Sequence, residues 1–542
     1  MRILVGISRA VALGAALVGV CVVALSAGGV AGASAGSAHS AGGVSESIHW
    51  GACDPPGPDL QCARIRVPLD WDRPHGRTIN LALARHLASK PDERIGTAFI
   101  DPGGPGDTGV GLVTGDPEGV DAIGGGRFDV VGWDPRGAQG STRVRCFKSR
   151  RAEDRFWAGA SFPTTRSQAK RAERRGAAVA RRCGEVSGWL LPHISTADTA
   201  RDLDHLRALM GEEKMTYIGL SYGSYIGQTY ANLFPDRVRA IVLNGNVDPV
   251  RYARSAEARI AMWAEPADDV LREFLSLCDA AGPERCALAG GDEPAAERWD
   301  RLRALAKRDP IPAPAANGTS LSRSKLSYGD LLISQFQPFR APRTWPDHAA
   351  DLAAALRGNA SALEDSAGFF TSAAGWSSGT TSSAIQCADA PARKRPGAWL
   401  QVFKRQKRLG PLTGAVHFAW EWATCASWPV RGEDAYRGPW NAVTPNPILV
   451  VNQTHDPNGS YANAVAAEKL LGNAVLLTHE GYGHLWFQDP STCVDEAMAD
   501  YLTELITPPR GTVCQSDHQP FDPDFGQPNR MGQKLRFGRS GP

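Results

Sequence analysis

Runs of strand-forming residues alternate along this chain with glycine-rich turns and helical segments, and this alternation restricts the possible folds more than any other feature. Strands alternating with helices predict a mostly parallel sheet that helices cover on both faces. The alternation stops near Pro249 and resumes at Pro447. The pattern predicts strands within 96–106, 128–137, 214–220 and 238–245, helices at 196–211 and 224–235, and then a strand at 447–453, a helix at 462–472 and a strand at 474–479.

Between the two alternating series the chain is predicted to be mainly helical, with a loop at 310–325. The tail is polar and rich in glycine and proline, a composition typical of disorder. We therefore expect an α/β fold divided as follows: leader 1–39, first half of the sheet domain 45–249, helical insertion 250–446, second half of the sheet domain 447–515, and disordered tail 516–542.

The N-terminus has the layout of a secretory signal peptide. Arg2 and Arg9 precede an apolar run at 10–30, and the small residues "AGASA" follow it. A membrane anchor is the alternative, but the many Ala and Gly residues and the small-residue end favour cleavage. Because no later run of about 18 apolar residues occurs, we expect a secreted, extracellular protein with no stable membrane association after cleavage.

The charge pattern argues against a nucleic-acid partner, and the number of cysteines agrees with export. The net charge is +2, and the basic block at 170–183 suits a solvated helix face, so nucleic acid is not an expected partner. Beyond Cys21 the chain has ten cysteines, an even number typical of disulfides in exported proteins. A zinc site is the alternative, but no C-x-x-C occurs, so we expect no metal and no other cofactor. Short loops favour the pairs 53–62, 146–183, 278–286, 387–425 and 493–514.

The pattern G-x-S-x-G occurs three times and needs its context to be interpreted. "GASAG" at 32–36 belongs to the leader, and "GWSSG" at 375–379 lies in a Ser/Thr/Gly-rich segment with no strand before it, which predicts a loop. Ser221 alone has a predicted strand before it and a helix after it. That is the context of a nucleophile elbow, which lifts a serine hydroxyl above the sheet. Ser221 is the predicted nucleophile.

A serine nucleophile needs a base and an acid that orients the base, and elbow hydrolases supply them in the order Ser, acid, His. Asp456 follows a late strand and is the predicted acid; Asp248 is the alternative, although an Asp-Pro turn or helix cap is its common use. His484 lies in a glycine-flanked loop and is preferred as base over His479, which ends a strand. His455 is predicted to be a bystander.

Backbone N–H groups must also stabilise the negative charge that develops on the attacked carbonyl oxygen. One donor of such an oxyanion hole is the residue after the nucleophile, here Tyr222. The other comes from an earlier loop, and "DPGGPG" at 101–106 is the candidate. Its prolines have no N–H, and we favour Gly104 among its glycines.

Together these motifs resemble the secreted bacterial tripeptidyl aminopeptidases of the α/β-hydrolase fold, which are related to prolyl aminopeptidases. Further matching motifs are "QCARIRVPLDWDRP", "FDVVGWDPRGAQGST", "AIQCAD", "CASWP" and "GYGH", spread over nearly the whole chain after the leader. The resemblance implies Ser221 as nucleophile, Asp456 as acid, His484 as base, and a helical cap between the halves of the sheet. One departure is Asp101-Pro102-Gly103-Gly104, where prolyl aminopeptidases begin the loop with His-Gly-Gly; the tail is also longer than expected.

The expected function is a serine exopeptidase that releases short peptides, tripeptides by the resemblance, from free N-termini. An esterase or small-molecule amidase with the same three residues is the closest alternative. A protonated α-amine requires carboxylates or carbonyls for its recognition. Asp389 and Glu421 are the candidates, since each lies near one cysteine of the expected 387–425 pair.

Overall fold

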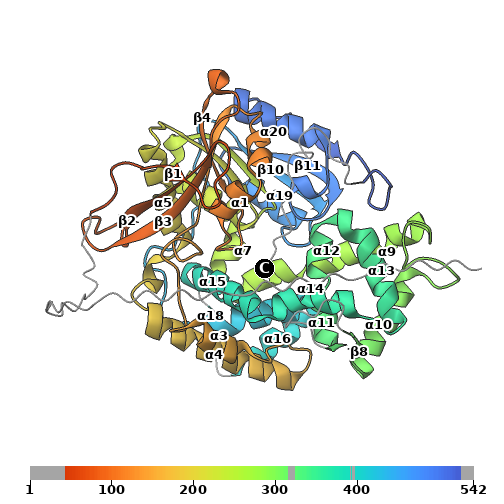
Figure 1. Cartoon of the computed structure of the whole chain (residues 1–542). Coiled ribbons are helices and arrows are strands. Elements are labelled where there is room, and N and C mark those ends of the chain that lie inside the picture. Colours follow the sequence, from red (N-terminus) through yellow and green to blue (C-terminus); the bar gives the residue numbers. More distant parts are fainter. Residues whose placement is uncertain (1–42, 315–323, 391, 393–396, 526–542) are drawn as a thin grey trace, which may run out of the picture. The chain divides into compact units, whose positions relative to one another are not determined.

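The structure is a computed structural model that describes residues 43–314, 324–390, 392 and 397–525 (Figure 1). The predicted leader at 1–39 lies outside the described residues. No helix among the residues described is long and apolar enough to cross a membrane.

A ten-stranded sheet forms the centre of the fold, in the order β1-β2-β3-β5-β4-β6-β7-β10-β11-β12. The pairings from β1 to β5 are antiparallel, and those that join β5, β4, β6, β7, β10, β11 and β12 are parallel, which confirms a mostly parallel sheet. The strands are β1 (Gly51–Ala52), β2 (Leu60–Pro68), β3 (Thr78–His86), β4 (Gly96–Asp101), β5 (Phe128–Trp133), β6 (Met215–Leu220), β7 (Val238–Asn244), β10 (Ile448–His455), β11 (Ala474–Tyr482) and β12 (Val513–Gln515).

Helices cover both faces of this sheet, as the alternation predicts. Successive side chains of a strand point to opposite faces, and here they divide between two hydrophobic clusters. Tyr217 packs in the cluster of helices α5 (Thr196–Leu209) and α6 (Tyr222–Leu233). Its neighbour Ile218 packs in the other cluster. That cluster includes residues of α1 (Gly109–Gly115), α2 (Pro117–Ile123) and α20 (Thr492–Glu504).

The segment between β7 and β10 is mainly helical and contributes a third hydrophobic cluster. The predicted loop at 310–325 differs in part: Ile311–Pro312 (β8) pairs with Lys325–Leu326 (β9), and residues 315–323 lie outside the described part of the chain. The helices are α7 (Pro249–Arg254), α8 (Ala256–Ala264), α9 (Ala267–Ala281), α10 (Ala295–Arg308), α11 (Tyr328–Ile333), α12 (Phe336–Arg340), α13 (Trp345–Leu356), α14 (Ser361–Thr371), α15 (Ala373–Asp389), α16 (Ala398–Leu409), α17 (Gly414–His417) and α18 (Ala423–Cys425), with a π-helix at Phe418–Trp422. Outside this segment lie α3 (Arg150–Trp157), α4 (Arg166–Ser187) and α19 (Tyr461–Leu470).

The prediction of a loop at "GWSSG" is wrong, because the whole motif lies inside helix α15. Ser372 caps this helix by accepting a hydrogen bond from the N–H of Gly375 at 3.0 Å. The hydroxyls of Thr380 and Ser383 donate to the carbonyls four residues earlier, at 2.8 and 2.7 Å. Hydroxyl side chains that bond back in this way can be accommodated inside a helix despite their low propensity.

The expected disorder of the tail does not hold for its first ten residues. Phe521 is buried and its ring lies 5.9 Å from that of Phe274 and 6.1 Å from that of Trp345. Burying one large aromatic side chain stabilises the segment that carries it. The composition of the segment could not show this docking, since it depends on a hydrophobic cluster formed by helices distant in the sequence. Residues 526–542 lie outside the described part.

All five expected disulfides are present: Cys53–Cys62, Cys146–Cys183, Cys278–Cys286, Cys387–Cys425 and Cys493–Cys514. The pair Cys387–Cys425 joins α15 to α18, 38 residues apart. Bonds of this kind form in oxidising compartments. They agree with an exported protein.

We expect the protein that lacks residues 1–39 to show no titratable thiol when it is denatured without reductant. Replacing Cys387 and Cys425 together with alanine should lower the free energy of unfolding by roughly 2–4 kcal/mol, because the unfolded chain regains the freedom of a long loop. Urea denaturation of both proteins measures the difference. The bridge Cys278–Cys286 closes a much shorter loop and is the matched control, with a smaller expected loss. Two or more free thiols in the denatured protein would contradict the five pairs.

Candidate active site

Ser221 occupies a strained turn between strand β6 and helix α6. Its φ is +55°, a left-handed value that is unusual for a non-glycine residue. The flanking glycines make the turn possible. A Cβ on Gly219 would lie 2.4 Å from the carbonyl oxygen of Gly223, and one on Gly223 would lie 2.6 Å from that of Asp101. The sequence therefore folds here into the sharp strand-to-helix elbow that exposes a serine hydroxyl, and Ser221 remains half-buried.

His484 and Asp456 meet beyond the ends of β11 and β10. The Nδ1 atom of His484 lies 2.9 and 2.8 Å from the two carboxylate oxygens of Asp456. Asp456 is held in turn by the N–H groups of Asn458 and Gly459, both at 2.8 Å. The carboxylate accepts, so Nδ1 carries the proton and Nε2 keeps its lone pair. Both side chains are buried, and Nε2 has no hydrogen-bond partner among the described residues.

Burial sets the protonation state of this histidine. It lowers the pKa of His484, and the Asp456 carboxylate opposes the shift only in part. The neutral imidazole is therefore favoured near neutral pH. A neutral imidazole with a free Nε2 is the form that can accept a proton.

The end of strand β7 positions both the serine and the histidine loop. The carbonyl oxygen of Asn244 accepts the N–H of Ser221 at 2.8 Å, and its side-chain oxygen accepts the N–H of Trp486 at 3.0 Å. The next residue, Gly245, has φ +67°, and a Cβ there would lie 2.8 Å from Cε1 of His484. The structure thus brings Ser221 and His484 to the same strand end and joins His484 directly to Asp456.

The loop after β4 lies against the elbow. Gly103 has φ +100°, and a Cβ on it would lie 2.8 Å from both Cβ of Ser221 and N of Tyr222. The N–H of Gly103 is occupied, since it donates to Oδ1 of Asp101 at 2.9 Å. Gly104 is exposed, and Tyr222 is the first residue of α6, so its N–H lies outside the hydrogen-bond ladder of that helix. Both N–H groups are thus without a partner among the described residues, and their role as the two oxyanion donors stays a prediction.

The alternative acid and bases have other partners. Asp248 caps α7 by accepting from the N–H groups of Val250 and Arg251 at 2.9 and 3.0 Å. His479 is buried and hydrogen-bonded to Ser516 at 3.2 Å. His455 pairs with Asp269 at 2.8 Å. Each of these contacts is structural.

Asp389 does not face an open site. It is 1% exposed and accepts from the N–H and hydroxyl of Thr196, both at 2.7 Å, and from the hydroxyl of Tyr252 at 3.3 Å. Burial raises its pKa to about 6. The hydroxyl of Thr196 also contacts that of Tyr222 at 2.5 Å. The carboxylate therefore joins α15 to the N-terminus of α5, next to Tyr222, the residue that follows Ser221.

Glu421 is likewise occupied by an internal partner. Its carboxylate accepts from Nε of Arg259 at 2.7 Å, and both side chains are buried. Burial raises the pKa of Glu421 to about 7, against the effect of the arginine. A buried carboxylate that already has a cationic partner is poorly suited to bind a substrate amine, so the structure does not support this expectation.

Three charged residues beside the elbow were not singled out from the sequence. Asp101 braces Gly103, and burial raises the pKa of Asp101 well above its usual value. Asp107 directly follows the glycine-rich loop at 103–106 (the glycine loop), and this position in the sequence could have identified it as a candidate. Arg340 accepts the backbone N–H of His484 through its carbonyl oxygen at 2.9 Å. Nothing in the local sequence of Arg340 indicates this contact, which joins segments 144 positions apart.

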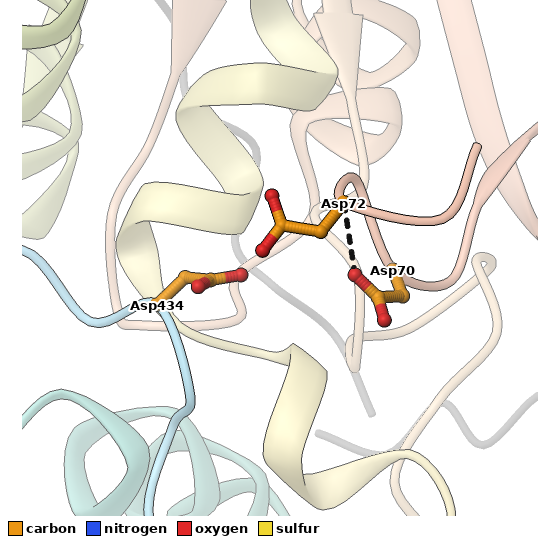
Figure 2. A group of neighbouring side chains, drawn as sticks. All are labelled: Asp70, Asp72 and Asp434. Carbon is orange, nitrogen blue, oxygen red and sulfur yellow. Dashed lines mark hydrogen bonds between the residues drawn. The ribbon is translucent and has the colours of Figure 1, made fainter.

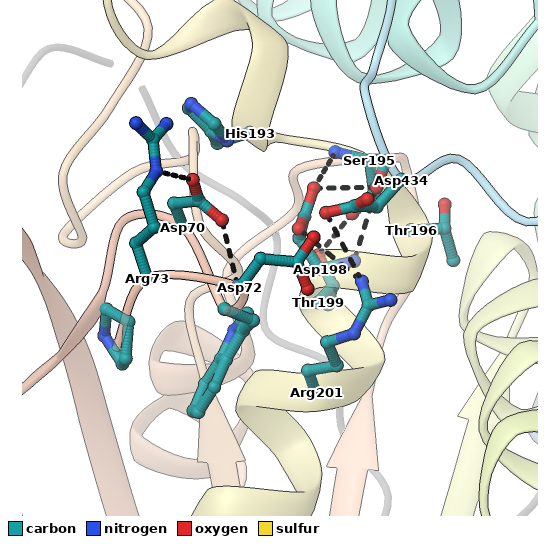
Figure 3. A network of polar contacts seen from close by, with 12 residues as sticks. Asp70, Asp72, Arg73, His193, Ser195, Thr196, Asp198, Thr199, Arg201 and Asp434 are labelled. Atoms are coloured by element: carbon teal, nitrogen blue, oxygen red, sulfur yellow. Dashed lines mark hydrogen bonds and ion pairs between the residues drawn. The ribbon is translucent and has the colours of Figure 1, made fainter. Parts of the chain in front are cut away.

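One acidic group could offer ligands to a cation. Asp70, Asp72 and Asp434 each place one carboxylate oxygen within 4.8 Å of the others (Figure 2). Figure 3 shows the polar network around them, in which Asp70 pairs with Arg73 and Arg201 lies 3.8 Å from Asp434. These arginines already balance part of the charge. We interpret this network as structural, because it connects the β2–β3 loop, the start of α5 and the 432–436 loop.

Comparisons with known proteins agree with this architecture. A family model described as alpha/beta hydrolase fold matches residues 102–272, and one described as TAP-like protein matches 411–514. The chain is 30% identical over 497 residues to Serine protease Hip1 of Mycobacterium tuberculosis, covering 87% of this chain and 91% of the relative. It is 31% identical over 482 residues to Tripeptidyl aminopeptidase of Streptomyces lividans, covering 84% and 83%. Carboxylesterase B of Mycobacterium tuberculosis is 28% identical over 476 residues, covering 84% and 86%.

Proposed function

Because the chain belongs to the α/β-hydrolase family that includes the tripeptidyl aminopeptidases, we propose that it is a secreted serine exopeptidase releasing tripeptides from free N-termini. That it is a serine hydrolase of the peptidase type follows from the family. The observation that carries the proposal is the buried Asp456–His484 pair, with Nε2 unpartnered, beside the strained elbow of Ser221.

In this proposal Ser221 is the nucleophile. Its Oγ attacks the carbonyl carbon of the scissile peptide bond while Nε2 of His484 takes the hydroxyl proton. Asp456 keeps the proton on Nδ1 and stabilises the imidazolium that forms. The N–H groups of Tyr222 and Gly104 donate to the carbonyl oxygen as it becomes negative.

The intermediate then collapses and the C–N bond breaks. His484 returns its proton to the leaving nitrogen, so the shortened peptide departs as a neutral amine and an acyl-Ser221 ester remains. Water attacks this ester with His484 again as base, which releases the acyl peptide as its acid and restores the serine hydroxyl. No proton or electron pair is left unassigned.

Contact between the helical segment and the oxyanion loop supports an exopeptidase over an endopeptidase. A Cβ on Gly106 would lie 3.2 Å from Cγ2 of Thr381 and 3.6 Å from Cδ1 of Ile385, both in α15. A helix this close to the loop limits the approach of a long, folded polypeptide to Ser221. A chain end can enter where a loop of a folded protein cannot. The five disulfides and the predicted leader support secretion.

We expect N-acetylation of a tripeptide anilide to lower kcat/KM at least tenfold, about 1.4 kcal/mol of lost recognition. The physical reason is the loss of a positive charge that the site is proposed to bind. Steady-state kinetics on the free and acetylated substrates give the ratio, and mass spectrometry of products from longer peptides gives the length released. Equal cleavage of both substrates would reject the aminopeptidase proposal.

An esterase or small-amide hydrolase is the second candidate, and the similarity to a relative named Carboxylesterase B favours it. The same three residues would serve both reactions. Comparing a short acyl ester with the free tripeptide anilide separates the two candidates, since an esterase would prefer the ester even after correction for its greater intrinsic reactivity.

A further inference from the structure

We propose that Asp107 is the carboxylate that binds the α-ammonium group of the substrate. The inference rests on the proposed aminopeptidase function and names a residue that determines its specificity. It replaces Asp389 and Glu421, whose carboxylates are occupied by Thr196 and Arg259.

Asp107 lies directly beside the proposed oxyanion donor. Its N–H donates to the carbonyl oxygen of Gly103 at 3.2 Å, which closes the glycine loop into a turn. A Cβ on Gly104 would lie 3.0 Å from Cγ of Asp107. The carboxyl group therefore packs against the same short loop whose other side contacts Ser221.

This placement fits the length of a short acyl group. Adding the contacts of Gly103 and Gly104 to standard backbone dimensions puts Cγ of Asp107 within about 13 Å of Cβ of Ser221. An extended peptide spans at most about 3.3–3.6 Å per residue, so three residues cover about 10 Å. With an ammonium–carboxylate contact of about 3 Å added, this span matches the upper bound, so the amine of a released tripeptide can reach Asp107.

The carboxylate of Asp107 is available. The side chain is exposed, and within the described part of the chain it makes no hydrogen bond or ion pair. Asp456 and Asp101, the other acids at this end of the sheet, are buried and engaged with His484 and Gly103. Oδ2 of Asp101 also has no partner among the described residues, but it is buried, whereas Asp107 is exposed and open to a ligand from solvent.

The charged groups around Asp107 leave its carboxylate without a direct partner among the described residues. Although the side chain is exposed, crowding by protein atoms raises its pKa, while Arg340 and His484 act in the opposite direction. The neighbouring Gly106 lies against α15, so protein atoms border this part of the loop on one side. Arg340 forms no ion pair with it in the described structure and lies over the ring of Phe336 at 5.7 Å. A substrate ammonium in direct contact would give this carboxylate the partner that it lacks.

The test compares kcat/KM for a free tripeptide anilide and its N-acetyl form in four proteins: wild type, Asp107→Asn, Asp107→Glu and Glu118→Gln. Wild type should prefer the free peptide at least tenfold. Asp107→Asn should reduce the preference to less than twofold, mainly through KM for the free peptide, and should still react with an uncharged serine-directed phosphonate. Asp107→Glu should restore part of the preference. Glu118 is exposed on α2, and its variant removes the same charge elsewhere, so it should match wild type.

Each of the other possible results would contradict either the role of Asp107 or the proposed function. A wild type that prefers the free peptide, together with an Asp107→Asn variant that keeps the preference, would overturn the role of Asp107 and leave the proposed function intact. No preference in wild type would reject the proposed function itself. An equal loss for both substrates and for phosphonate labelling would show that Asp107 only supports the glycine loop, which also overturns the inference.

Discussion

Replacing Ser221 with alanine is expected to lower kcat at least about 10³-fold while the protein stays folded. The hydroxyl is the atom that attacks, and alanine removes it without adding volume at a position whose φ of +55° the elbow imposes. Turnover of a free tripeptide anilide measures the loss. Circular dichroism and the unchanged disulfide content test the fold.

The same substitution at another serine is the control. Ser377 also lies in a G-x-S-x-G motif, but it is inside helix α15, so Ser377→Ala should keep activity within about twofold. His484→Ala should be about as severe as Ser221→Ala, and Asp456→Asn milder, because triad members act as one unit. Loss of activity in Ser377→Ala with retention in Ser221→Ala would show that the elbow assignment is wrong.

The sequence was enough to propose Ser221, Asp456 and His484 as site residues, because their signals are local. A strand, a turn that needs glycine and a helix follow each other within about 20 residues around Ser221, and each element has its own periodicity. The disulfide pairs were predictable for a similar reason, since each bridge joins two consecutive cysteines of the sequence.

The misplaced expectations depend on contacts between distant segments. Glu421 was chosen for its place beside Cys425, but its partner Arg259 lies 162 positions away and is itself wholly buried. Asp389 is joined to Thr196 across 193 positions. No local pattern predicts which buried cation or N–H group will meet a given carboxylate. Only the packing of the helical segment on the sheet domain decides it.

Asp107 and Arg340 are the opposite case. Both lie beside the proposed site, and the sequence analysis did not single them out. Asp107 directly follows the glycine loop in the sequence, but only the structure shows that its carboxyl packs against Gly104 and makes no hydrogen bond or ion pair with the described residues. Arg340 reaches the site because its carbonyl holds the N–H of His484. The three residues proposed to carry the chemistry could be predicted from the sequence, whereas the charges proposed to select a substrate could not.

Replacing Gly103 with alanine is expected to lower kcat at least about 100-fold, because it displaces the oxyanion loop or the elbow. Its φ of +100° is unfavourable for alanine, which costs about 1–3 kcal/mol. The new Cβ would also lie 2.5 Å from the carbonyl oxygen of Leu220 and 2.8 Å from Cβ of Ser221. The nearest contact is backbone, so no flexible side chain can move away.

The variant should therefore lose activity more than it loses stability. Such a difference would show that the substitution disturbs the geometry of the site and does not simply unfold the protein. Kinetics on the free tripeptide anilide and a thermal melt of the same preparation measure the two effects. Gly115→Ala is the matched control: Gly115 ends helix α1 with open space around its Cβ position, so activity there should stay within about twofold. If Gly103→Ala kept kcat within about threefold of wild type, a methyl group at this position would not disturb Ser221, and the assignment of this loop to the oxyanion hole would fail.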